Sequence, residues 1–307
     1  MIVVLTGGLG NQLFQTAAAL KLVNYESKNL FFDSITGKPR VNKTGVAEVY
    51  EYITFKPEEY IPSKSRFFRK IYRLNLLLSA RKSTYPGLII KKLLAYMSSL
   101  AMSFHAKKLL LLLVSNGIGY DKKYDFIFLK TTRLLIGYFQ SYIYFDRFML
   151  IPKLLMPSKS ALLKITELVE NLRVSKKVLI HVRRGDYVNE PDFGLLGLDY
   201  YSEAISYFED LGFKEFLVFS DDINVAKDML DSLTGLHIEY FSERELGSSH
   251  VLEVMTYAAG FIIANSTFSW WAAYMRKNIS ANVCAPSKWF LRQQDPYCLI
   301  PNDWLRI

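Results

Sequence analysis

The chain has 307 residues, half of them hydrophobic and 22% charged, and a formal net charge of +9. This composition excludes a disordered chain, and the length corresponds to about two ordinary domains. Two cysteines, Cys284 and Cys298, exclude a disulfide scaffold and favour free thiols in a reducing compartment. The four histidines are not grouped at metal-ligand spacing, so we expect no metal site.

The chain opens with the pattern strand, glycine turn, helix, strand. Residues 2–5 are an apolar run that predicts a buried strand, and residues 11–23 place Leu13, Phe14, Ala17 and Leu20 on one helical face. Residues 29–32 predict the next strand. No secretion signal precedes the first strand, and no apolar run is long enough to span a bilayer, so we expect a cytoplasmic location.

The positive charge lies in one segment. Residues 60–120 contain eleven Lys or Arg and no Asp or Glu, which leaves the rest of the chain at about −2. Within that segment, residues 63–114 mix apolar and cationic side chains at helical spacing and predict helices broken near Pro86. We interpret them as a basic helical insert that makes peripheral contact with an anionic membrane on its cytoplasmic face. Nucleic acid is not expected as a partner.

The pattern changes near residues 152–157, which suggests domains at 1–152 and 153–307. In the second half, the apolar runs 178–182, 216–219 and 261–264 are typical of parallel strands. Helical stretches lie between them, at about 200–211, 225–233 and 252–259. Strands alternating with helices indicate an α/β domain with a parallel sheet, in which ligands bind at the carboxyl ends of the strands.

Three polar motifs follow predicted strands. The first is GGLGNQLFQ, residues 7–15, where glycines and a helix N-terminus favour a phosphate or a developing anion. The second is HVRRGDY, residues 181–187. Strand alternation places His181 and Arg183 on one side, and a guanidinium matches two phosphate oxygens. Arg184 and Asp186 are candidates to pair and brace this loop.

The third motif is NSTFSWWAA, residues 265–273. Capping of the following helix by itself accounts for Ser266 and Thr267, and core packing for the aromatic residues, but an anion cradle would use the same groups. Asp221 and Asp222 end the strand FLVF. One acidic pair is weak evidence for a metal, so we expect them to anchor a loop or make a polar contact.

Taken in order, these motifs resemble the bacterial α-1,2-fucosyltransferases of glycosyltransferase family 11. The resemblance rests on GGLGNQLFQ, HVRRGDY, LDYYSEAI, FSDD, IIANSTFSWWAA and PSKWF, and it covers nearly the whole chain. It implies a two-domain GT-B-like α/β fold and inverting, metal-independent transfer of L-fucose from GDP-β-L-fucose to the 2-hydroxyl of a galactose-terminated glycan, such as an O-antigen. Two segments depart from the family pattern, residues 256–260 and the basic insert.

The resemblance also implies roles for particular residues. Arg183 would bind the β-phosphate, and Asn11 belongs to the expected catalytic set. Asp186, Glu190 and Asp192 are the carboxylates near Arg183 in the sequence, and Asp186 is our candidate for the base that completes this set. The residues expected to contact the donor are Gly8, Leu9, Gly10, Asn11, His181, Arg183, Asp221, Asn265, Ser266, Thr267, Phe268 and Ser269. A cationic side chain would stabilise the leaving diphosphate in place of a metal ion.

Two other classes of function remain open on the sequence. Gly8-x-Gly10 after a strand, with Asp33 at the end of the next, is compatible with a nicotinamide-dependent oxidoreductase, although Leu13 replaces the third glycine. The basic insert is compatible with a non-catalytic membrane-surface binder.

Overall fold

The computed structural model describes residues 1–59, 112–114, 134–154, 159–189, 193–233, 235–292, 295 and 298–307. The chain forms two compact units: the first is Met1–Met156 with Pro296–Leu299, and the second is Pro157–Asp295 with Ile300–Ile307. The division therefore falls four residues after the expected one, and a short C-terminal segment groups with the first unit. Each unit is built on a parallel sheet, which is the α/β fold class that we expected.

The first unit contains a parallel sheet with the strand order β3-β2-β1-β5-β4. Its strands are β1 (Ile2–Val4), β2 (Phe31–Asp33), β3 (Glu58–Glu59), β4 (Leu112–Val114) and β5 (Leu134–Ile136). Its described helices are α1 (Leu9–Leu22), η1 (Ser27–Asn29), η2 (Glu48–Glu51), η3 (Tyr142–Tyr144), α5 (Arg147–Leu150) and η4 (Ile151–Lys153). Helix α1 buries the predicted face, including Leu13, Phe14, Ala17 and Leu20.

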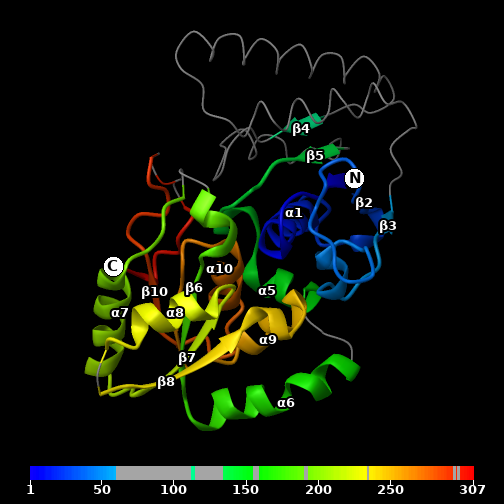
Figure 1. Ribbon diagram of the computed structural model, residues 1–307. Helices are drawn as coiled ribbons and strands as arrows, with labels where there is room; N and C mark the ends of the chain where they lie inside the picture. Colours follow the sequence, from blue (N-terminus) through cyan, green and yellow to red (C-terminus); the bar gives the residue numbers. More distant parts are fainter. Residues whose placement is uncertain are drawn as a thin grey trace. The chain divides into compact units, whose positions relative to one another are not determined.

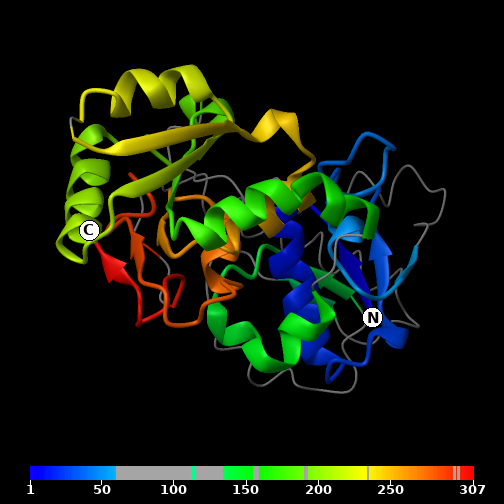
Figure 2. The same ribbon diagram turned by 90° about the horizontal axis from the view of Figure 1, so that it is seen from below.

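The second unit contains a six-stranded parallel sheet with the order β11-β10-β9-β6-β7-β8 (Figures 1 and 2). Its strands are β6 (Val178–Val182), β7 (Glu215–Ser220), β8 (His237–Ser242), β9 (Gly260–Ile262), β10 (Val283–Ala285) and β11 (Leu305–Arg306). Its described helices are α6 (Lys159–Val174), η5 (Gly185–Asn189), α7 (Leu198–Asp210), α8 (Ile223–Leu230), η6 (Glu243–Glu245), α9 (Ser248–Met255) and α10 (Thr267–Tyr274). Because the strands are parallel, their carboxyl ends meet at one edge.

Strand β6 lies inside this sheet and is buried throughout. Val178, Ile180 and Val182 belong to the apolar core that includes residues of α7 and α8. Because side chains alternate along a strand, His181 projects to the opposite face of the sheet. Arg183 is the first residue after the strand. A buried histidine in this strand is the exception in an otherwise apolar element.

Several expected elements are confirmed and others differ. Strand β6 has the expected bounds, whereas β9 begins one residue early and ends at Ile262. Strands β8, β10 and β11 and helix α6 were not anticipated. β8 lies at the edge of the sheet and is partly exposed along its length, which obscures a buried-strand pattern. Residues 112–114, expected to end a helical insert, form strand β4 instead, and the rest of the insert, residues 63–111, lies outside the described residues.

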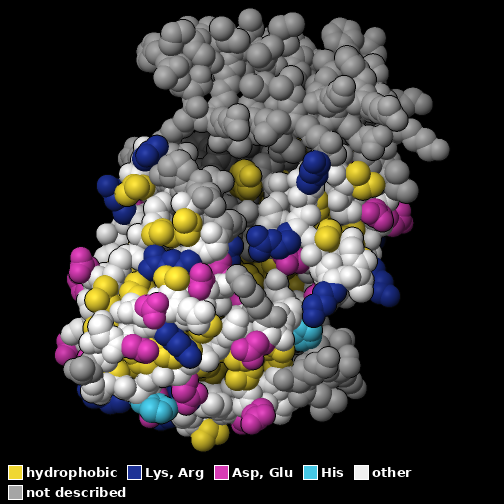
Figure 3. All heavy atoms as spheres, viewed as in Figure 1, with side chains coloured by type: hydrophobic (Ala, Val, Ile, Leu, Met, Phe, Trp, Pro, Cys, Tyr) yellow, Lys and Arg dark blue, Asp and Glu magenta, His cyan; other side chains and the backbone are white. Residues whose placement is uncertain are grey.

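Both cysteines are free and buried, as expected. Among the residues that the structure describes, no helix is long and apolar enough to cross a membrane. Lys, Arg, Asp and Glu side chains are interspersed over the described surface seen in Figure 3. This mixture agrees with the low net charge of the chain outside its basic segment.

Candidate functional site

The carboxyl end of β6 carries a guanidinium held by a neighbouring carboxylate. Arg183 Nη1 lies 3.1 Å from Asp221 Oδ2, and both side chains are mostly buried. The other oxygen of Asp221 accepts a hydrogen bond from the Arg184 amide at 2.9 Å. Asp221 follows β7, the strand beside β6, so the sheet itself places these two groups together. The carboxylate thus fixes both the side chain of Arg183 and the backbone next to it.

Gly185 leaves the space that this arrangement needs. A Cβ atom at position 185 would lie 2.2 Å from Asp221 Oδ2, far inside van der Waals contact. The glycine in HVRRGDY is therefore required by the approach of the carboxylate. The loop is braced by Asp221, and the predicted pair of Arg184 with Asp186 stays untested because the side chain of Asp186 lies outside the described residues. Arg184 instead turns inward, where its Nη2 lies 2.9 Å from the Met229 sulfur.

A row of aromatic rings extends from the guanidinium. The Arg183 guanidinium lies 5.5 Å from the centre of the Tyr187 ring. Tyr187 stacks on Phe193 at 4.7 Å, and Phe193 contacts Phe290 at 5.4 Å. Cation–π contact and stacking restrict the orientation of Arg183 in addition to its ion pair with Asp221.

Asn265 holds this row of rings together. Its amide nitrogen donates to the carbonyl oxygens of Phe193, Gly194 and Trp289, at 2.8, 3.3 and 3.2 Å. The main-chain carbonyl oxygen of Asn265 accepts a hydrogen bond from the Tyr187 hydroxyl at 3.1 Å. The buried side chain of Asn265 therefore positions the segments that carry these rings, and its contact with the donor stays a prediction.

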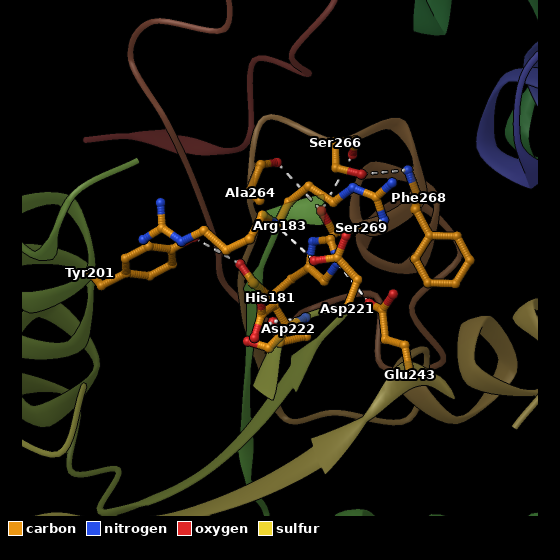
Figure 4. A network of polar contacts seen from close by, with 12 residues as sticks. His181, Arg183, Tyr201, Asp221, Asp222, Glu243, Ala264, Ser266, Phe268 and Ser269 are labelled. Atoms are coloured by element: carbon orange, nitrogen blue, oxygen red, sulfur yellow. Dashed lines mark hydrogen bonds and ion pairs between the residues drawn. The ribbon is translucent and has the colours of Figure 1, made fainter. Parts of the chain in front are cut away.

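The N-terminus of α10 faces the same edge of the sheet. Ser266 caps the helix, with its hydroxyl accepting the Phe268 amide at 3.3 Å, and Ser269 is buried with its hydroxyl donating to main-chain carbonyls. Thr267 and Phe268 are partly exposed. In Figure 4 the Arg183 side chain points toward the segment of Ser266 and Phe268. A cation and a helix N-terminus at one site form an arrangement suited to a diphosphate.

The expected core role of the neighbouring tryptophans is also clear. Trp270 and Trp271 are fully buried, and Trp270 stacks on Tyr274 at 4.7 Å. These rings anchor α10 rather than reach a ligand.

Sequence reasoning missed Glu243, which lies in the same network (Figure 4). Its Oε1 is 2.8 Å from His181 Nε2. His181 is fully buried, whereas the Glu243 side chain keeps 13% of its exposure. The imidazole was expected to lie near the nucleotide, but in the structure the carboxylate is the more accessible member of the pair. The edge strand β8 was not predicted, so nothing in the sequence pointed to the residue after it.

The glycine loop of the first unit differs from a free anion cradle. Gly8 precedes α1, and the amide of Leu9 donates to the buried carboxylate of Glu48 at 2.8 Å. Glu48 was missed, and it supplies the negative charge that the helix N-terminus favours. Leu9 and Gly10 are buried, and Asn11 accepts a hydrogen bond from Gln140 at 2.7 Å. The polar groups of this loop therefore make internal contacts.

Asp33 does not suit a dinucleotide site. It is buried, and its Oδ1 accepts the amides of Ile35 and Thr36 at 3.0 and 2.8 Å. These bonds form a local turn, whereas a ribose would require an accessible carboxylate. The structure thus weakens the oxidoreductase alternative.

Among the described residues, one cluster of three side chains could hold a metal ion: Glu215, His237 and Glu239. Glu215 and His237 are the first residues of β7 and β8, and Glu239 is the third residue of β8, so the cluster lies toward the opposite edge of the sheet from Arg183. Lys177 forms an ion pair with Glu239, and His237 Nδ1 lies 2.8 Å from Glu215, so internal pairs account for the cluster.

The amino-acid sequence also matches a known protein family. A sequence profile described as Glycosyl transferase family 11 matches residues 122–298, which is more than half of the chain. The chain belongs to glycosyltransferase family 11. The matched region contains Arg183, Asp221, Glu243 and Asn265, so the network described above lies within the part shared with the family.

Three relatives add detail to the family assignment. This family 11 chain is 29% identical over 315 residues to the "O-antigen biosynthesis glycosyltransferase WbnK" of Escherichia coli, with 93% of each chain covered. It is 33% identical over 150 residues to an "Alpha-1,2-colitosyltransferase" of Escherichia coli, covering 46% of this chain and 51% of the relative. It is 30% identical over 164 residues to a "Galactoside 2-alpha-L-fucosyltransferase" of Caenorhabditis elegans, covering 47% and 42%.

Proposed function

We propose that this family 11 enzyme transfers L-fucose from GDP-β-L-fucose to the 2-hydroxyl of a terminal galactoside, with inversion at the anomeric carbon. The observation that carries the proposal is the Arg183 guanidinium, held by Asp221 at the carboxyl edge of the sheet and directed toward the N-terminus of α10. Family membership and the names of two relatives support a fucosyl or colitosyl donor.

The proposed chemistry follows from where charge develops. As the bond between the anomeric carbon and the phosphate oxygen breaks, negative charge gathers on GDP. A preorganised guanidinium and backbone amides at that point stabilise the transition state more than the ground state, and each well-placed group contributes about 3 kcal/mol. Arg183 supplies the cation that the mechanism would otherwise take from a metal. Metal independence is thus part of the proposal, and it predicts that EDTA leaves turnover unchanged.

The acceptor hydroxyl must lose a proton as it attacks. Asp186 is our candidate base because it follows Gly185 in η5, beside the Arg183 loop. Glu190 and Asp192 lie outside the described residues and remain the other candidates. Asp186→Asn is expected to lower kcat at least tenfold without changing GDP affinity, and an unchanged kcat would move the role to another carboxylate.

The decisive test of the proposal is Arg183→Ala. We expect the transfer rate to fall about 100-fold or more, because one group that stabilises the transition state is lost. The unfolding temperature should change little. Arg183→Lys keeps the charge but loses the forked geometry, so a partial loss is expected. Arg173→Ala is the matched control, since Arg173 is an exposed arginine paired with Glu170. A folded Arg183→Ala enzyme with normal turnover would refute the proposal.

Donor identity is settled by a screen with a β-galactoside acceptor. GDP-fucose is expected to support transfer, and GDP-mannose, UDP-galactose and NAD are expected to be inactive. Transfer of colitose is the second candidate because of the 33% identical colitosyltransferase, so GDP-colitose is included. The linkage and anomeric configuration of the product are read by NMR.

Membrane contact through residues 63–114 is a separate part of the proposal. Cosedimentation with anionic vesicles at low and high salt tests it, because electrostatic binding is screened by salt. Absence of binding at low salt would remove it without affecting the proposed transfer reaction.

A further inference from the structure

Glu243 lies just beyond the end of a strand, at a position that its contact with His181 does not fully explain. It follows β8 directly, and β8 is separated from β6 by β7 alone. Because the three strands are parallel, Glu243 and Arg183 lie past the same edge. Neighbouring strands are about 4.8 Å apart, so the ends of β6 and β8 are roughly 10 Å apart. That distance is comparable to the span from a diphosphate to its nucleoside.

The two members of the His181–Glu243 pair differ in their exposure to solvent. His181 is fully buried and its Nε2 lies 2.8 Å from Glu243 Oε1, while the ring centre is 6.2 Å from the Phe268 ring. The histidine is thus held behind the carboxylate and cannot itself meet a ligand. The Glu243 side chain is 13% exposed, so its carboxylate is the group of this pair that a ligand can reach.

We propose that Glu243 contacts the nucleoside half of the donor, and that His181 is a positioning residue that orients its carboxylate. The inference rests on the proposed use of a GDP-sugar. A carboxylate accepts two neighbouring hydrogen-bond donors, and a guanosine offers two such pairs. One is the ribose 2′- and 3′-hydroxyls, and the other is guanine N1–H with the 2-amino group.

The contrasting interpretation is that Glu243 and His181 form an ion pair that only stabilises the fold. That role would not depend on which nucleotide is present. Discrimination between nucleotides is therefore the measurement that separates the two, since a purely structural contact would leave it unchanged.

The experiment measures dissociation constants by calorimetry for GDP, inosine diphosphate and 2′-deoxy-GDP. Inosine diphosphate lacks the 2-amino group, and 2′-deoxy-GDP lacks one ribose hydroxyl. The wild type is expected to bind one of these two analogues about tenfold or more weaker than GDP. In Glu243→Gln, GDP binding should weaken by a similar factor, and the ratio of the dissociation constants of the analogue and GDP should fall to about one. Loss of the inosine preference identifies guanine contact, and loss of the deoxy preference identifies ribose contact.

Glu245→Gln is the matched control, because Glu245 is an exposed carboxylate in the same short helix. It is expected to bind all three nucleotides as the wild type does. His181→Gln should weaken GDP binding less than Glu243→Gln and should add little in the double variant. If Glu243→Gln lowers the unfolding temperature too far for titration, Glu243→Asp provides the same comparison with the charge retained.

Unchanged GDP affinity and unchanged preferences in a folded Glu243→Gln enzyme would overturn the inference. Equal weakening for all three nucleotides, with the preference retained, would also overturn it and leave the structural interpretation. Both results are distinct from failure of the proposed function, in which the wild type itself would bind none of the guanine nucleotides and Arg183→Ala would not alter turnover.

Discussion

Asp221 holds Arg183 and the backbone of Arg184 at the same time, through one carboxylate oxygen each, at 3.1 and 2.9 Å. The guanidinium is therefore oriented before any ligand arrives. Preorganisation of this kind lowers the cost of reaching the transition state because the charged group need not be reoriented during the reaction.

Asp221→Asn is expected to lower kcat at least tenfold. An amide cannot hold the guanidinium as a carboxylate does, but it also no longer repels a diphosphate, so GDP affinity should stay within about threefold of the wild type. Steady-state kinetics and GDP titration measure the two effects. Asp222→Asn is the control, since Asp222 caps α8. A parallel loss of GDP binding and kcat in Asp221→Asn would show that Asp221 does more than position Arg183.

Gly185→Ala tests the same contact without removing a charge. The added Cβ would lie 2.2 Å from Asp221 Oδ2, so the carboxylate must move away from Arg183. We expect a loss of turnover close to that of Asp221→Asn, and the double variant should be no worse than either, because both break one contact. Gly197→Ala, where the added atom meets open space, should retain normal turnover. Additive losses in the double variant would argue against a shared cause.

Asn265→Ala is expected to destabilise the protein by about 2–4 kcal/mol, because three carbonyls lose their donor in a buried place. Urea unfolding followed by circular dichroism measures the change. Asn278→Ala is the control, since Asn278 is exposed and its side-chain oxygen accepts a local hydrogen bond from the Ser280 amide. A stability loss no larger than that of the control would mean that ordered water replaces the amide.

Alkaline pH should reveal the buried thiol. Burial raises the pKa of Cys284 from its ordinary 9.0 to about 12, so the unfolded chain loses this proton first as pH rises. The free energy of unfolding therefore falls between pH 9 and pH 12, by up to about 1.4 kcal/mol per pH unit from this group. Cys284→Ala should show a shallower fall over that range. Identical slopes for the two proteins would contradict the raised pKa of the thiol.

The sequence by itself determined the α/β class, the strand β6 with its arginine, and the family. Buried parallel strands are continuous apolar runs, and the motifs that end them are local, so both can be read along the chain. The helix α1 with its apolar face and the two free cysteines could also be predicted from the sequence.

Tertiary structure alone decided which groups meet. Asp221 was recognised in the sequence, but only the pairing of β6 with β7 shows that it binds Arg183 and explains Gly185. Local patterns do not point to Glu48 or Glu243, because their partners are far away in the sequence. Glu48 is 39 residues from Leu9, and Glu243 is 62 residues from His181. Such contacts depend on how strands are ordered in a sheet, and that order is set by long-range packing, which no local pattern encodes.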